Sequence, residues 1–397
     1  MDLVRKEYEL TCMAPVHIGN GITLKAYEYV YDDHQQQVLF LDEKKWIAFL
    51  YEKGLMDDFT EYVNVTARAL AGKGNFRGQY LWDWLSCHGV VAEEIRALSK
   101  RCVTVAKDKI INGKNHLNDI AQQVMLPDGR LYIPGSTIKG ALRTAILWQA
   151  IEQHPAHFAG IWEQLCSLDF KNFRYTKRKI GDEIRLLEQQ ILHALDVTHT
   201  AHDAVNSALR GLRISDASTD ARKTIILQKI DESMQAGYPQ PKEKFLPIFR
   251  ECIPAGTKLH VSITADSSML QMIGISSLEE LMHTLHAYTQ DTLLAEKKVF
   301  GHANANIFCE AEMADVLLGG GTGFLSKTLV RALAPDEGEA KWFISHYLDM
   351  AFSRSHKPMH NHVNLDTFLS PRTLKVAKAG QKTWILGLCR FEEMTGC

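Results

Sequence analysis

Alternation of polar and apolar residues marks the start of the chain as a β-strand. The alternation covers residues 4–16 and ends at the loop "APVHIGNG". A hairpin is predicted in "LKAYEYVYDDHQQQVLFLD", with its turn at residues 32–33. Helical periodicity follows over residues 44–70 and again over 76–100. The pattern therefore places strands first and helices over them.

The rest of the chain mixes helices and strands. Helices are predicted after a short strand, up to residue 153, and over residues 158–210, 277–298 and 338–352. Four strands lie between the second and third of these helical regions, in "GLRISDAS", "KTIILQKID", "KFLPIFRECI" and "TKLHVSITAD". We expect them to form a meander in the sheet of the first strand. This mixed order predicts an α+β fold of the split β-α-β type.

Composition narrows the class of protein. The 397 residues predict about two domains, and 46% hydrophobic with 23% charged residues is typical of a globular chain. The formal charge of -2 gives no overall basic field, so binding to nucleic acid has to come from local patches. The eight cysteines form no C-x-x-C pair, and the sequence shows neither a signal peptide nor a long apolar stretch. We therefore expect a reduced, cytoplasmic protein.

The segment "LYIPGSTIKGALRTAIL" combines a turn with the start of a helix. We expect Ser136 or Thr137 to cap this helix, while Lys139, Gly140 and Arg143 share its exposed face with Ser136. The helix dipole, the free amides and two cations favour a phosphate there, and Gly140 leaves room for a backbone. The alternative is a capped amphipathic helix whose basic face is merely solvated.

A glycine cluster in "LGGGTGFLSKT" is the second candidate for binding phosphate. It consists of Gly319, Gly320, Gly321 and Gly323. Such a loop can point its amides inward, and Lys327 is expected one turn into the next helix. The spacing fits neither a Walker A loop nor a dinucleotide fingerprint. The alternative is a strand-to-helix connection that needs positive φ angles.

A third candidate, "FKNFRYTKRKIG", interleaves basic and aromatic residues. The cations proposed to bind RNA are Lys171, Arg174, Lys177 and Arg178, and Phe170, Phe173 and Tyr175 lie among them. Charge that pairs with phosphates and rings that stack on bases suit single-stranded nucleic acid. The alternative is a solvated helical face with aromatic residues in the core.

Candidates for catalysis are fewer. His199, His202 and Asp203 lie close together, but the other ligands of a metal-dependent phosphohydrolase are not identifiable. His17, beside the first glycine loop, is a candidate general acid or base for RNA cleavage. The sequence therefore predicts no metal site and no cofactor.

The order of the motifs carries a family resemblance. "APVHIGNG", "IPGSTIKGALRTAI", "LRISDAS", "ECIPAGTKLHVSI" and "GGGTGFLSKT" follow one another over about residues 4–330. In this order they resemble the RAMP superfamily of CRISPR proteins. Within it, the sequence is similar to the subunit that caps the 3′ end of the guide RNA in type III-A Csm complexes.

The resemblance implies a fold and a division into domains. The fold is a ferredoxin-like (RRM-type) core with helical insertions and a C-terminal α/β extension. Residues 1–265 would form the RAMP domain, with a helical insertion at about 158–210. Residues 266–397 would form a C-terminal domain that carries the glycine-rich loop 319–323.

The resemblance also implies a function. It is that of a non-catalytic subunit that binds crRNA and other RAMP or Csm subunits, and supports complex assembly and crRNA maturation in antiviral defence. Recruitment of host nucleases is left open. The RNA backbone would contact the helix from Ser136 to Arg143, the glycine-rich loop and Lys327. The aromatic signature with which RRM domains stack bases is absent, so recognition should be of backbone and shape.

Two other functions are weighed against this one. The aspartate with which RAMP backbone subunits cleave target RNA has no match here, so no nuclease site is assigned. A RAMP endoribonuclease that processes guide precursors, with His17 as its catalytic group, is the main alternative. A nucleotide-dependent enzyme is disfavoured, because Walker and Rossmann spacings are missing.

Overall fold

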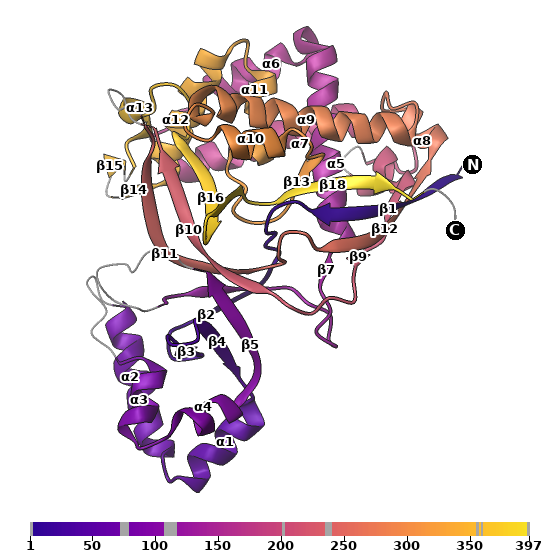
Figure 1. Ribbon diagram of the computed structural model, residues 1–397. Coiled ribbons are helices and arrows are strands. Elements are labelled where there is room, and N and C mark those ends of the chain that lie inside the picture. Colours follow the sequence, from indigo (N-terminus) through magenta and orange to yellow (C-terminus); the bar gives the residue numbers. More distant parts are fainter. Residues whose placement is uncertain are drawn as a thin grey trace.

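The fold is that of a computed structural model, in which two curved sheets and a layer of helices form the main body (Figure 1). A small lobe extends from one end of this body. The structure describes residues 3–71, 79–106, 117–200, 203–234, 240–354, 357–358 and 360–394. None of the helices in these ranges is long and apolar enough to cross a membrane.

The first sheet has the strand order β13-β18-β1-β12-β9-β7, and β8 pairs with β12. Its strands are β1 (Leu3–Cys12), β7 (Tyr132–Ile133), β8 (Leu212–Ile214), β9 (Ala217–Ser218), β12 (Lys258–Asp266), β13 (Val316–Leu317) and β18 (Leu388–Glu393). The predicted first strand is confirmed. Tyr8 and Leu10 of β1 lie opposite Val261 and Leu259 of β12 in an antiparallel register. Both β1 residues are buried, as alternation requires of a strand that covers a core on one face.

In the described part of the chain, nine helices form the layer above the sheets, and some of them cover one face of the first sheet. The nine are α5 (Gly135–Gln153), α6 (Pro155–Cys166), α7 (Phe173–Leu192), α8 (Ser267–Gln271), α9 (Leu278–Phe300), α10 (Ala305–Ala311), α11 (Val330–Leu333), α12 (Glu337–Ala351) and α13 (His362–Leu365). Ile138 and Leu142 of α5 and Leu281 and Leu285 of α9 are fully buried in the same core cluster as β1. The apolar stripes of α5 and α9 therefore hold these two helices on the sheet.

The second sheet has the order β2-β6-β11-β10-β5-β4-β3, with β16 on β10 and β17 on β16. Its strands are β2 (Gly19–Leu24), β3 (Val30–Asp32), β4 (Gln37–Leu41), β5 (Ser99–Ala106), β6 (Ile120–Gln123), β10 (Ile225–Ser233), β11 (Lys242–Cys252), β16 (Thr373–Ala379) and β17 (Lys382–Ile385). A two-stranded ribbon, β14 (Ser353–Arg354) with β15 (Lys357–Pro358), lies apart.

The prediction of one meander in a single sheet is wrong. Strands β10 and β11 pair with each other in the second sheet, whereas β12 pairs with β1 in the first. The chain changes sheets between β11 and β12, at a turn where Gly256 has a positive φ of 85°. Alternation identifies a strand but not its neighbours, since tertiary packing selects the pairing.

The small lobe consists of four helices packed on the β3–β4 hairpin and β5. The helices are α1 (Glu43–Glu52), α2 (Met56–Ala71), α3 (Leu81–Cys87) and α4 (Ala92–Ala97). Trp46, Trp84 and Leu39 belong to its separate core. The helical prediction over 44–70 is confirmed as two helices. The second prediction, over 76–100, runs too far, because β5 begins at Ser99 and residues 72–78 lie outside the described part.

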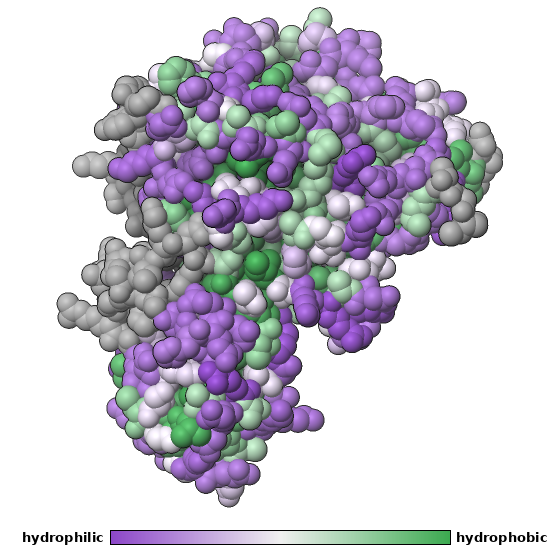
Figure 2. Space-filling model, viewed as in Figure 1, coloured by the Kyte–Doolittle hydropathy of each residue, from purple (hydrophilic) through white to green (hydrophobic). Residues whose placement is uncertain are grey.

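The predicted helical insertion and domain boundary can be compared with these elements. Helices α6 and α7 span residues 155–192, so they begin three residues before the insertion predicted at about 158–210 and end 18 residues before its end. The first sheet takes β12 from before the predicted boundary and β13 and β18 from after it. The boundary at residues 265–266 stays a prediction. Figure 2 shows polar side chains over most of the upper body and a group of apolar ones where the small lobe joins it.

Candidate nucleic-acid interface

Helix α5 begins directly after strand β7, at a close contact with the β8–β9 connection. Pro134 precedes the helix, and the N–H of Gly135 donates to Oδ1 of Asp216 at 2.8 Å. A Cβ at position 135 would overlap the carbonyl oxygen of Ile214, so glycine is needed there. The prediction that Ser136 or Thr137 caps the helix is wrong, because both lie inside its first turn and the cap is supplied by Asp216.

Three of the predicted residues of α5 form an exposed strip. Ser136, Gly140 and Arg143 are exposed, while Lys139 is half-buried. A Cβ at Gly140 would meet no described atom within 4 Å. Packing within the described part of the chain therefore does not account for a glycine at this position, although glycine weakens a helix by roughly 1 kcal/mol relative to alanine. The free space suits close approach of a ligand backbone.

Both cations of α5 already have partners in the isolated chain. The ammonium of Lys139 donates to the carbonyl oxygen of Leu212 at 2.7 Å, and burial lowers its pKa. Arg143 forms an ion pair with Glu188 of α7, with 3.0 Å between Nη2 and Oε1. Lys139 thus fastens the helix to β8, and a phosphate at Arg143 has to compete with Glu188.

The second glycine-rich segment is the loop that follows β13. Gly319, Gly321 and Gly323 have φ values of 85°, 92° and 92°, a region that other residues rarely adopt. The N–H of Gly320 donates to the carbonyl oxygen of His17 at 2.7 Å. A Cβ at Gly319 would overlap the same oxygen. At this end, the segment that packs closely against the glycine-rich loop is therefore the chain's own first glycine loop, through His17.

Three cations surround the glycine-rich loop. Lys327 donates from Nζ to the carbonyl oxygen of Gly319 at 2.6 Å. It ends a short 3₁₀ helix, Leu325–Lys327, and the next α-helix begins only at Val330, so the prediction that Lys327 lies one turn into that helix is wrong. Arg250 of β11 lies 3.5 Å from the position of a Cβ on Gly321, and its buried Nη1 has no hydrogen-bond partner in the described structure.

The third cation, Lys375 of β16, contacts the far end of the loop. Its Cγ lies 3.8 Å from the position of a Cβ on Gly323, and Glu296 of α9 lies at 3.7 Å on the other side. Burial raises the pKa of Glu296 to about 8, and the charge of Lys375 opposes this rise. The loop therefore carries positive charge along its edge and an inward-facing carboxyl that is protonated near neutral pH.

Two of the candidates for catalysis, His17 and Asp203, make hydrogen-bond contacts with the backbone of the chain. The imidazole of His17 is 6% exposed, and its Nδ1 lies 2.6 Å from the carbonyl oxygen of Glu251. Burial lowers the pKa of His17, which favours the neutral ring. Asp203 accepts from the N–H of Val205 and caps a 3₁₀ turn, while His202 lies outside the described residues. Within the described ranges, no three His, Cys, Asp or Glu side chains are placed to hold a metal.

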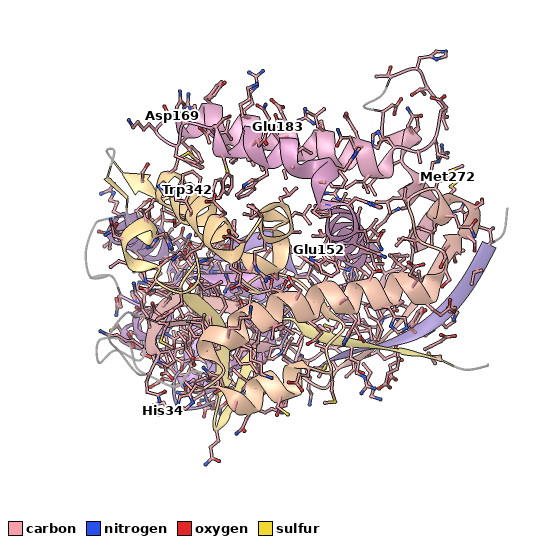
Figure 3. The ribbon with its side chains drawn as sticks, turned by 90° about the horizontal axis from the view of Figure 1, so that it is seen from above. His34, Glu152, Asp169, Glu183, Met272 and Trp342 are labelled. Carbon is pink, nitrogen blue, oxygen red and sulfur yellow. The ribbon has the colours of Figure 1, made fainter. Side chains whose placement is uncertain are left out.

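The basic and aromatic segment forms the beginning of α7. Its four predicted cations, Lys171, Arg174, Lys177 and Arg178, are exposed. Phe173 and Tyr175 are 39% and 51% exposed, whereas Phe170 packs edge-on against Trp342 and Phe343. One ring therefore packs against the core and two face solvent, and binding of RNA by this segment stays a prediction. Figure 3 shows Asp169 near Trp342, at the outer edge of the helical layer.

The structure places the three segments apart. Helix α5 follows β7 at one edge of the first sheet, and the glycine-rich loop follows β13 at the opposite edge. The α7 segment lies in the helical layer. The sequence interpretation missed Arg250, Lys375 and Asp216, because each lies on a strand or loop far along the chain from the motif it contacts. No local pattern marks such residues.

Comparisons with known proteins agree with this architecture. Residues 9–270 match the family model of the RAMP superfamily. A Mycobacterium tuberculosis (strain CDC 1551 / Oshkosh) protein named CRISPR system Cms protein Csm5 is 24% identical over 413 aligned residues, which cover 98% of each chain. The Streptococcus thermophilus protein of that name is 24% identical and covers 81% of this chain and 79% of its own.

Two solved structures have a similar fold. One chain of a Csm–crRNA–target RNA ternary complex from a type III-A CRISPR-Cas system superposes with a TM-score of 0.63. It is 19% identical, and the match covers 98% of this chain and 100% of that chain. The crystal structure of T. onnurineus Csm5 gives 0.54 at 18% identity, with coverage of 81% and 92%. Since the family model spans more than half of the sequence, this chain belongs to the RAMP superfamily.

Proposed function

We propose that the chain is a Csm5-type subunit of a type III-A CRISPR complex, which binds the guide RNA and caps its 3′ end without cutting RNA. The Mycobacterium tuberculosis relative named Csm5 matches it over nearly the whole length of both chains. One structural neighbour comes from a complex that contains crRNA and target RNA. By this proposal its partners are crRNA and other Csm subunits, and it works in the cytoplasm.

The first sheet supports a ferredoxin-like core for this subunit. Strands β1, β9, β12 and β18, in sequence order, take the spatial order β18-β1-β12-β9. Helix α5 connects the first two and α9 connects the last two. This connection pattern is the one expected of a β-α-β-β-α-β unit.

The observation that carries the RNA-binding part is the strip on α5. Gly140 leaves an open space between the exposed Ser136 and Arg143, in a helix whose opposite face is fully buried. A strip of this kind suits a sugar-phosphate backbone, which needs close approach and a cation rather than base-reading side chains. The cations beside the glycine-rich loop offer a second phosphate contact.

The proposal that the chain does not cleave RNA rests on the position of His17, the candidate general acid or base. An RNA-cleaving base has to reach a 2′-hydroxyl within hydrogen-bond distance. His17 is buried beneath the glycine-rich loop, and its Nδ1 contacts a backbone carbonyl. Its geometry therefore supports a structural role.

Incubation of the purified chain with end-labelled repeat RNA, with and without Mg²⁺, tests the proposal. We expect a protein–RNA complex that contains only intact RNA. The His17→Ala variant should give the same RNA pattern, with lower stability because a buried side chain is lost. Cleavage products that disappear with His17→Ala would instead establish the endoribonuclease. Failure of the folded chain to retain RNA would contradict the binding role.

A further inference from the structure

A cavity of about 740 Å³ lies beside the far end of the glycine-rich loop. Its floor is formed by the ends of β10, β11 and β16, and its roof by the end of α12 and by α13, in the upper left of Figure 1. Phe324, the residue after Gly323, lines one side. One side of the cavity therefore adjoins the glycine-rich loop.

The charged groups that line the cavity give it a positive potential. Its cations are Lys229, Lys242, Lys244, Arg372 and Lys375, and its carboxylates are Asp231 and Glu243. Both carboxylates are already paired: Asp231 with Lys229 and Lys375, and Glu243 with Lys378. Among the described residues, no carboxylate lies within ion-pair distance of Lys242 or Lys244, and both are exposed.

His360 lines the cavity, and burial and the positive charges around it lower its pKa. Partial burial lowers the pKa of His360, and the positive charges of its neighbours, Lys244, Arg372 and Lys375 among them, lower it further. These cations come from β11 and from the start of β16, and all three line the cavity. Such a group of cations attracts an anionic ligand.

A hydrogen-bonded network fixes the inner wall. The buried carboxylate of Asp366 accepts from Ser370 Oγ at 2.7 Å and from Arg372 Nη1 at 2.5 Å, and its Oδ2 lies 2.8 Å from Nδ1 of His362. This network holds His362 and Arg372 in place. The Nε of Arg372 is buried without a hydrogen-bond partner in the described structure. A buried donor without a partner is costly.

Aromatic side chains line the two ends of the cavity. Phe352 is 45% exposed, which is unusual for a side chain of its size, and it packs edge-on against His360 at 5.1 Å between ring centroids. Phe324 lines the end next to the glycine-rich loop and contacts Tyr347. Exposed rings beside cations suit a flat, apolar group that carries a negative charge.

We propose that this cavity binds a single nucleotide, with its base against Phe352 or Phe324 and its phosphate at Lys244 and Arg372. The volume suits one small ligand rather than a run of nucleotides. Two sources have this chemistry: the end of an RNA that follows the glycine-rich loop, and a free mononucleotide. The first source rests on the proposed function, and the second does not.

Two titrations of the full chain test the proposal. The first measures binding of AMP by calorimetry. The second measures fluorescence of RNAs that carry 2-aminopurine either as the 3′-terminal base or at an internal position, since stacking on an aromatic ring quenches this base. The variant Phe352→Ala with Lys244→Ala should bind AMP about tenfold or more weakly, because a base stack and a phosphate contact are lost.

A matched control changes an exposed ring and lysine in the small lobe. Tyr51 is 80% exposed and Lys44 is exposed on the same helix, so Tyr51→Ala with Lys44→Ala removes similar groups far from the cavity. This control should bind AMP as the natural chain does. Melting curves of both variants show whether either one is unfolded.

The possible results distinguish three cases: the cavity binds the end of an RNA, it binds a free mononucleotide, or it binds no nucleotide. Quenching of the terminal base alone, reversed by AMP, identifies the RNA end as the ligand. Binding of AMP without terminal quenching identifies a free nucleotide. Absence of AMP binding and of terminal quenching overturns the proposal, as does an equal loss of binding in the control variant. Guide RNA affinity is measured in parallel, because its loss with AMP binding intact would contradict only the proposed function.

Discussion

The N–H of Gly320 donates to the carbonyl oxygen of His17 at 2.7 Å, which joins the two glycine-rich loops of the chain. The first loop follows β1 and the second follows β13, so the contact links opposite ends of the sequence. Since His17 also contacts the Glu251 carbonyl of β11, the same residue connects the loops to the second sheet. Contacts within the chain therefore hold this end of the glycine-rich loop in place.

This contact predicts that Gly319 is required for stability. In Gly319→Ala, the new Cβ would overlap the His17 carbonyl at a φ of 85°. We expect a loss of about 1–3 kcal/mol in the free energy of unfolding, measured by urea denaturation. Gly140→Ala is the contrasting variant, because its Cβ meets open space and should stabilise the helix by about 1 kcal/mol. Equal stability of the two variants would contradict this assignment.

Gly140 should matter for RNA instead. Leucine at position 140 favours the helix, yet its side chain would fill the space proposed for the RNA backbone. We expect Gly140→Leu to melt at or above the temperature of the natural chain and to bind guide RNA at least several-fold more weakly. Gly160→Leu in α6 is a matched control, since Gly160 is also an exposed helical glycine with open space around it. Equal RNA affinity in both variants would remove the α5 strip from the interface.

The ion pair between Arg143 and Glu188 predicts two opposite effects on RNA binding. Arg143→Ala should reduce the slope of log affinity against log salt by roughly 0.7, because one phosphate contact is lost. Glu188→Gln should raise affinity, because Arg143 no longer has to exchange a carboxylate for a phosphate. Both residues are near the surface, so stability should change by less than about 1 kcal/mol. An unchanged salt slope in Arg143→Ala would show that this arginine makes no phosphate contact.

Glu296 predicts a pH dependence of stability. Its pKa is about 8 in the folded protein and near 4.5 when unfolded, so the folded state binds the extra proton between these values. Its contribution is fully present below about pH 4.5 and is lost as the pH rises toward 8. Glu296→Gln should therefore gain stability relative to the natural chain as the pH rises, by at most about 1.4 kcal/mol per pH unit. A pH-independent difference between the two would contradict a buried, protonated Glu296.

The sequence predicted the individual strands and helices better than it predicted which strands pair with each other. The alternation that buries Tyr8 and Leu10 and the stripe that buries Ile138 and Leu142 are local patterns, and both were correct. The assignment of β10 and β11 to the first sheet was wrong, because the choice of partner strand depends on contacts far along the chain.

The candidate site shows the same division. Gly140 and Arg143 were predicted as an exposed strip, and they are exposed. The partners of the two cations, Leu212 and Glu188, and the cap from Asp216 were not predicted, because they are set by packing between elements. The glycine-rich loop was expected to contact the backbone of a bound RNA. The His17 backbone of the chain itself already occupies one side of the loop.

Protection of the 3′ end of the guide RNA is the direct measurement of the proposed role. A reconstituted complex with 5′-labelled guide RNA is exposed to a 3′→5′ exonuclease, with the natural chain, with Gly140→Leu or with this subunit omitted. We expect the natural chain to leave a longer protected guide than the complex without it, and Gly140→Leu to give the shorter product. Guides of one length in all three reactions would contradict a subunit that caps the 3′ end.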